Sequence, residues 1–143
     1  MRDGLAGLAL LALASMALAG CAGMGGGTLY DRMGGAPVFD RAMDNVTVDI
    51  LSDGRVNRRF AGTPPNELKQ RLGGFVCVQA GGRCAYHGHD MPTSHRGMAI
   101  DDAEFDAMVE DISGGFAKAG VRPAEVAELR ALLNGMRGDI VGK

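Results

Sequence analysis

Apolar side chains recur at helical spacing along most of the chain after residue 27. The first stripe follows the spacing i, i+4, i+7 and i+11 and consists of Phe39, Met43, Val46 and Ile50. Three further stripes consist of Leu68, Leu72, Phe75 and Val76; of Phe105, Met108, Val109, Ile112 and Phe116; and of Val126, Leu129, Leu132, Leu133 and Met136. No stretch alternates as a half-buried strand would, so the pattern predicts an all-α fold.

Helix boundary signals support this division into four main helices. Thr63-Pro64-Pro65 is typical of an N-cap and first turn, and Pro123 opens the last helix in the same way. Asp101 and Glu104 have the spacing of a capping box, and Gly120 can end the helix that they begin. A fifth, short helix is expected around His95. These helices make up one domain over residues 28–143.

The first twenty residues have a different character. The stretch from Leu5 to Leu18 is almost wholly apolar, but it is too short to span a bilayer, so residues 1–20 are interpreted as an export signal. Leu18-Ala19-Gly20-Cys21 resembles a bacterial lipobox. It predicts lipidation of Cys21, a flexible tether over residues 21–27 and a membrane-anchored lipoprotein. The alternative is an ordinary secretory signal. Ala22 after Cys21 favours the outer membrane, with the domain facing the periplasm.

Composition limits the functional classes without choosing among them. The chain has 143 residues, of which 46% are hydrophobic, enough for one compact domain with an ordinary core. Fifteen basic and 17 acidic residues give a net charge of −2, with no basic block. Nucleic acid is therefore not an expected partner, because phosphate binding needs such a block.

The segment 81–98 carries the most specific chemistry. Gly81-Gly82 ends a helical pattern, and His95 follows on the short helix, where a neutral imidazole could ligate a metal ion or a haem iron. Together with His95, the nearby Cys84, His87 and His89 raise the alternative of zinc or copper. Their spacing lacks the paired ligands of a structural zinc site, and the second cysteine of a covalent c-type haem attachment is also missing.

Two further cysteines bracket the glycine pair. In an exported protein whose Cys21 is lipidated, Cys77 and Cys84 form an even pair, which predicts a disulfide. It would tie the end of the helix before Gly81 to the segment that leads to His95. The alternative is a pair of free thiols.

Several short motifs occur in an order that resembles one known family. They are Thr28-Leu29-Tyr30-Asp31-Arg32-Met33-Gly34-Gly35, Arg55-Val56-Asn57-Arg58-Arg59-Phe60, Phe75, Gly81-Gly82, Met91-Pro92-Thr93-Ser94-His95 and Phe105-Asp106. In this order and spacing, from about Thr28 to Val141, they resemble a group I truncated haemoglobin. The resemblance implies a two-over-two helical sandwich around one haem b, lined by residues such as Phe75 and Met91, with His95 as the proximal iron ligand.

The resemblance also locates the opposite, distal side of the haem. Counting without gaps places Thr47 where many group I proteins carry a tyrosine that bonds oxygen, and it places Leu68 and Leu72 on the haem-facing stretch. An apolar distal pocket follows, in which Thr47 could instead donate to its own helix. Arg71 is expected to reach a haem propionate, as His89 or Arg96 could.

Three functions are compatible with this sequence. The first is a haem protein that reversibly binds oxygen or another diatomic gas. The second is an enzyme, either a nitric oxide dioxygenase supported by a reductase or a weak haem peroxidase, although no general acid or base is evident above the iron. The third is a haem-free, zinc-binding lipoprotein using Cys84, His87 and His89. Gas binding is the preferred hypothesis.

Overall fold

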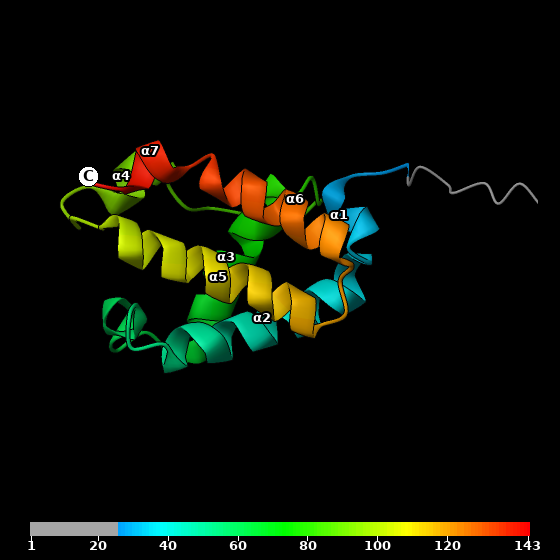
Figure 1. Cartoon of the computed structure of the whole chain (residues 1–143), viewed down its shortest axis with the longest axis horizontal. Helices are drawn as coiled ribbons and strands as arrows, with labels where there is room; N and C mark the ends of the chain where they lie inside the picture. The colour runs from blue at the N-terminus through cyan, green and yellow to red at the C-terminus, as the bar shows by residue number, and fades with distance from the viewer. Residues whose placement is uncertain (1–25) are drawn as a thin grey trace, which may run out of the picture.

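The computed structural model describes residues 26–143, and they form an assembly of helices (Figure 1). The elements are α1 (Leu29–Arg32), α2 (Gly35–Ser52), η1 (Asn57–Phe60), α3 (Pro65–Gln79), α4 (Met91–His95), α5 (Asp102–Lys118), α6 (Pro123–Asn134) and α7 (Arg137–Ile140). The predicted export signal, Cys21 and most of the tether lie outside the described residues. Within residues 26–143, no helix is long and apolar enough to cross a membrane.

The four long helices α2, α3, α5 and α6 and the short helix α4 confirm the predicted elements. The capping box at the start of α5 is also confirmed: the Asp101 carboxylate accepts from the Glu104 N–H at 2.8 Å, and Glu104 accepts from the Asp101 N–H at 3.2 Å. Gly120 ends α5 with a φ of 89°. One boundary differs from the expectation, because Pro64 and not Thr63 is the N-cap residue of α3.

The long helices are arranged as two pairs. Helix α2 packs against α3 and also against α5, and α5 packs against α6 (Figure 1). The crossing of α2 and α5 is close at Gly115, where an added Cβ would lie 2.4 Å from Val46 Cγ2 and 2.7 Å from the Val46 nitrogen. A side chain at this position would therefore force the two helices apart.

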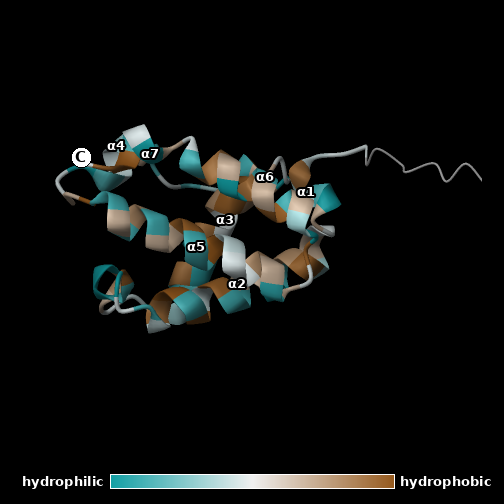
Figure 2. Cartoon of the chain, viewed as in Figure 1, coloured by the Kyte–Doolittle hydropathy of each residue, from teal (hydrophilic) through white to brown (hydrophobic). Residues whose placement is uncertain are grey.

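The core lies where these helices meet, and their apolar stripes face it (Figure 2). Its largest fully buried apolar side chains are Phe116, Met43, Ile50, Leu129, Val46 and Val76. The Phe39 ring packs edge-on against Phe116 with a centroid separation of 5.2 Å, and Tyr30 packs on Phe39 at the same separation. Helical periodicity thus identified the residues that pack.

Three short elements were not predicted. Helices α1 and α7 and the 3-10 turn η1 each have four residues, too few for an apolar stripe to repeat. The C-terminus folds back beside the start of α5: Ile100 and Val141 form an isolated parallel bridge, and the Gly142 N–H donates to the Ile100 carbonyl. This return places α7 against α4.

Asp111, on α5, is in an unfavourable position. Partial burial, reinforced by Asp53 and Asp49, raises the pKa of Asp111 to about 6, and its Oδ2 atom has no hydrogen-bond partner in the described part of the chain. The folded state therefore binds a proton more tightly than the unfolded state does, so stability rises as the pH falls through about 6. We expect Asp111→Asn to raise the unfolding free energy by about 1 kcal/mol at neutral pH, because partial exposure screens the charge.

Urea unfolding at several pH values tests this expectation. The advantage of Asp111→Asn should disappear as the wild-type carboxyl becomes protonated in mild acid. Asp106→Asn, an exposed position on the same helix, serves as the matched control. An equal gain at all pH values would show that the gain does not come from the charge.

Candidate functional site

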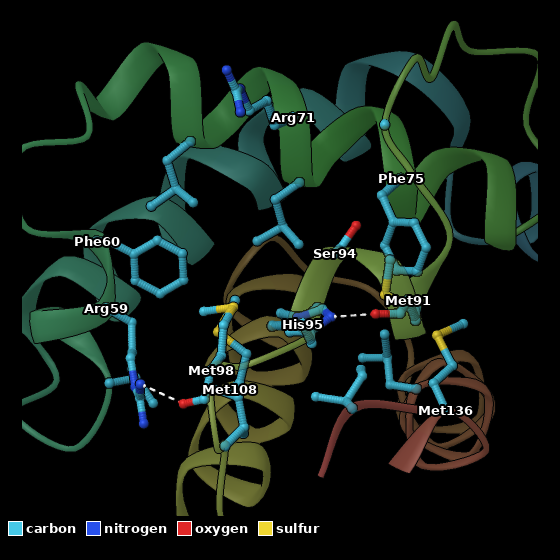
Figure 3. Close-up of a pocket in the computed structure, with 18 of the residues that line it drawn as sticks. Arg59, Phe60, Arg71, Phe75, Met91, Ser94, His95, Met98, Met108 and Met136 are labelled. Atoms are coloured by element: carbon cyan, nitrogen blue, oxygen red, sulfur yellow. Dashed lines mark hydrogen bonds between the residues drawn. The ribbon is translucent and has the colours of Figure 1, made fainter. Parts of the chain in front are cut away.

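A cavity of about 880 Å³ opens between α3 on one side and α4, α5 and α7 on the other (Figure 3). Its wall is mostly apolar, and it also carries His95. This volume lies within the range of sites that hold a cofactor or another small molecule. The wall combines residues from distant parts of the chain, including Val56, Phe60, Leu68, Leu72, Phe75, Met98, Phe105, Met108, Ile112 and Leu133.

His95 is the last residue of α4, and its ring is oriented by its own helix. Asp90 caps α4 by accepting from the Thr93 N–H at 2.8 Å, and hydrogen bonds from the side chain and the backbone of Thr93 hold the pKa of Asp90 below its usual value. His95 Nδ1 lies 2.9 Å from the Met91 carbonyl oxygen (Figure 3). A carbonyl can only accept, so Nδ1 carries the proton and Nε2 keeps its lone pair. This is the form in which histidine ligates a metal.

The α3 wall opposite His95 is apolar. Leu68, Leu72 and Phe75 line the cavity from this helix, as expected, and Phe60 joins them from η1. Thr47 is not where it was expected, because it is not among the cavity-lining residues. Its side chain is buried, and its hydroxyl donates to the Met43 carbonyl at 2.7 Å. A threonine is short enough for its own helix to satisfy its only donor.

Four methionines line the cavity on the side of His95. Met91 was expected there, whereas Met98, Met108 and Met136 come from the turn after α4, from α5 and from the turn before α7 (Figure 3). Met108 and Met136 were interpreted only as members of helix stripes. The turn after Asn134 removes Met136 from α6 and directs it to this wall. Unbranched thioether side chains can fit closely against an irregular surface.

An ion-pair cluster closes one edge of the cavity. The Glu104 carboxylate is buried and accepts from Arg59 at 2.7 and 2.9 Å and from Arg58 at 2.6 Å. Arg59 also donates to the Met98 carbonyl at 2.9 Å (Figure 3). Hydrogen bonds from Arg59 and Arg58 lower the pKa of Glu104 to about 2. The cluster therefore joins η1, the turn after α4 and the start of α5.

We expect Glu104→Gln to lower the unfolding free energy by about 2 kcal/mol at neutral pH, because the two guanidinium groups lose a buried partner. The stability that the carboxylate provides is complete above its ordinary pKa and is lost as the pH falls through about 2. The difference from wild type, measured by urea unfolding, should therefore shrink in strong acid. Glu110→Gln, an exposed position on the same helix, is the control, and an equal loss there would contradict this account.

Three residues were predicted as possible propionate contacts, and one of them, Arg96, is exposed and does not line the cavity. The Arg71 side chain borders the cavity, but its guanidinium is exposed and pairs with Glu67 at 2.7 Å, pointing away from the cavity (Figure 3). His89 lies on the exposed rim of the cavity. Its carbonyl accepts from the Tyr86 hydroxyl at 3.0 Å. Arg59 lines the cavity and was not predicted, although its place in the Arg55–Phe60 motif was a usable signal.

The predicted disulfide is present between Cys77 and Cys84, whose Cα atoms are 6.0 Å apart. Cys84 is therefore not a free thiolate for a metal. Among the described residues, no three histidine, cysteine or carboxylate side chains are grouped so that they could hold a metal ion. The zinc hypothesis loses its sulfur ligand.

This arrangement matches a known class of protein. The family model for bacterial-like globins matches residues 28–141, so the chain belongs to the bacterial-like globin family. Similar curated proteins include the group 1 truncated haemoglobin of Tetrahymena pyriformis, 28% identical over 81% of this chain and 96% of that protein. Another is GlbN of Nostoc sp., 28% identical over 81% of this chain and 98% of that protein.

Solved structures confirm the two-on-two globin fold. The Fe(III) form of Tetrahymena pyriformis truncated haemoglobin superposes with a TM-score of 0.77 at 27% identity, covering 82% of this chain and all of that one. The 2/2 haemoglobin of Synechococcus sp., in a form with covalently attached haem, gives a TM-score of 0.73 at 26% identity with the same coverage. The predicted fold class is therefore confirmed.

Proposed function

We propose that this protein is a truncated haemoglobin that holds one haem b and reversibly binds oxygen or another diatomic gas. The observation that carries the proposal is the hydrogen bond from His95 Nδ1–H to the Met91 carbonyl at 2.9 Å. It selects the tautomer and fixes the ring so that Nε2 is free to ligate iron. Membership of the globin family supports the same function.

The rest of the cavity fits a flat, largely apolar cofactor. Leucine and phenylalanine side chains from α3 line one side of the cavity, which has a volume of about 880 Å³, and methionines line the side of His95. Arg59 lies at the edge of the cavity, where its guanidinium is already paired with the Glu104 carboxylate. A haem held by His95 would supply the iron that binds a diatomic gas. The protein's residues hold the cofactor and keep water from the apolar α3 side.

An enzymatic function receives less support. Leu68, Leu72 and Phe75 face the cavity from α3, and none of them can donate or accept a proton. Three polar residues of the same helix also border the cavity, but from half-exposed or exposed positions: Glu67, Gln70 and Arg71. A peroxidase needs such a group above the iron, and a dioxygenase needs stabilised bound oxygen. Reversible gas binding makes neither demand.

Reconstitution of the domain that begins after Cys21 tests the proposal. Titration with haem should give a Soret band that saturates at one haem per chain, and the ferrous protein should change its spectrum reversibly with carbon monoxide. Zinc uptake is measured in parallel on the same sample. A protein that stays colourless and takes up zinc would overturn the proposal.

We also propose that the chain is exported and anchored by a lipid on Cys21 in the outer membrane, with its domain facing the periplasm. The apolar stretch up to Leu18 and the lipobox-like residues 18–21 support this placement.

In a diderm bacterium, we expect Cys21→Ser to move the protein from the membrane fraction to the soluble fraction and to abolish labelling by a fatty-acid analogue. Ala22→Ser is the control that should keep both. Membrane retention of Cys21→Ser would refute the anchor.

A further inference from the structure

The segment between α3 and α4 lies against α3 at Gly74, where an added Cβ would be 2.8 Å from the Ala85 carbonyl oxygen. Residues 81–90 contain no helix or strand, and most of them are exposed. The Tyr86 hydroxyl donates to the His89 carbonyl, and the Tyr86 ring packs against Phe75 with a centroid separation of 5.5 Å. The Gly82 N–H donates to the Cys77 carbonyl at 2.8 Å. This segment leads directly to the helix that carries His95.

The disulfide fastens this segment to the core. Cys77 is fully buried on α3, whereas Cys84 is exposed in the middle of the segment. The turn between them passes tightly over the sulfur, since a Cβ on Gly82 would lie 2.4 Å from Cys77 Sγ. Cys77 is therefore fixed in the core, whereas Cys84 belongs to an exposed part of the segment.

Helix α4 has little other support. It has five residues, none of which is buried, and its main helical neighbour is the four-residue helix α7. The Cys77–Cys84 bond is thus a covalent cross-link between α3, on one side of the cavity, and the segment that leads to His95 on the other side. Without it, α4 is held by α7 and by the continuous chain.

We propose that Cys84 is a site of thiol–disulfide exchange, and that a dithiol acting there releases the His95 segment and speeds the loss of haem. The proposal rests on the proposed haem-binding function. Its substrate class is a dithiol, either a small molecule or a protein with a pair of cysteines. The exposed residue Cys84 offers the point of attack, and the buried Cys77 is the leaving group.

The exchange balances as two steps. A thiolate of the dithiol attacks Cys84 Sγ, the bond to Cys77 breaks, and Cys77 leaves as a thiolate that takes up a proton. The second thiol of the reductant, as its thiolate, then attacks the reductant's first sulfur in the mixed disulfide. This step releases Cys84 as a thiolate, which also takes up a proton. Two electrons and two protons pass to the protein, and the dithiol becomes a disulfide.

Haem loss is measured by transfer to excess apomyoglobin, with dithiothreitol as the dithiol. We expect the reduced wild type to lose haem about tenfold faster than the oxidised protein, because a short loop is no longer closed. A Cys77→Ala/Cys84→Ser double variant should lose haem at this faster rate without dithiothreitol. Adding dithiothreitol to the double variant should change nothing, which controls for any effect of the reagent on the iron.

A second control separates the site from general stability. Ser113 is buried between α5 and α6, where it donates to Val109 and accepts from Arg130. Ser113→Ala should therefore lower stability but leave haem loss close to the wild-type rate. Hydrogen exchange of the haem-free protein should quicken over residues 81–95 on reduction, while α5 stays protected.

Equal rates of haem loss in the oxidised and reduced wild type would overturn the proposal. It would also fall if dithiothreitol failed to reduce the bond in the folded protein, or if its effect persisted in the double variant. A protein that takes up no haem would instead refute the proposed function, and hydrogen exchange would still report whether the bond restrains residues 81–95.

Discussion

His95→Gly is expected to lose haem more than about a hundredfold faster than the wild type, because it removes the iron ligand itself. Removing only a group that hydrogen-bonds to a metal ligand typically costs about 10- to 100-fold in affinity. The proposed ligand is a ring whose Nδ1 is already hydrogen-bonded to the Met91 carbonyl. Transfer of haem to excess apomyoglobin measures the rate, and the Soret band reports the altered coordination.

Added imidazole should restore part of the Soret spectrum of His95→Gly, because it can occupy the space left by the ring. His87→Ala and His89→Ala are the matched controls. Both positions border the cavity from the exposed segment, so these variants should keep the wild-type spectrum. An unchanged spectrum in His95→Gly, or its loss in His89→Ala, would show that His95 is not the ligand.

Leu68→Gln is expected to slow oxygen dissociation by about 10- to 100-fold, since it places a hydrogen-bond donor on an apolar wall. Bound oxygen carries partial negative charge, and hydrogen bonds to charged groups contribute about 1.5–3 kcal/mol. Leu68 is buried on the cavity-facing side of α3, and glutamine has a similar volume. Stopped-flow displacement of oxygen by carbon monoxide measures the rate.

Leu68→Met is the apolar control and should leave the dissociation rate near that of the wild type. The wild type itself should release oxygen quickly, because the Thr47 hydroxyl is committed to Met43. Thr47→Tyr tests the same idea from α2, because the longer tyrosine side chain can carry its hydroxyl past the helix backbone. Slow release from the wild type would mean that another donor reaches the gas and would contradict the apolar distal wall.

Most of the helical architecture was predictable, because the signals for it are local. Apolar stripes identified α2, α3, α5 and α6, and the Asp101–Glu104 capping box located the start of α5. Helix α7 and the bridge between Ile100 and Val141 were not predictable in this way. They depend on contacts between residues about forty positions apart, which no local period records.

The residues of the candidate site also differ in how far the sequence alone could place them. His95 was predicted as the iron ligand from its place after the glycine pair and from the resemblance, and the structure places it on the cavity wall together with Leu68, Leu72, Phe75 and Met91. Counting along the chain could not show that the Thr47 hydroxyl turns back to its own helix, or that Arg71 pairs with Glu67 outside the cavity. Both outcomes depend on the side-chain partners available in three dimensions.

The sequence by itself determined the helices, the candidate iron ligand and the pairing of Cys77 with Cys84. Each of these depends on residue type and on spacing within one segment of the chain. Only the tertiary structure decided that Arg59 pairs with Glu104, 45 residues away, and that Met136 joins Met98 on the wall around His95. Such contacts depend on how the packed helices place their side chains, and that is a property of the whole fold.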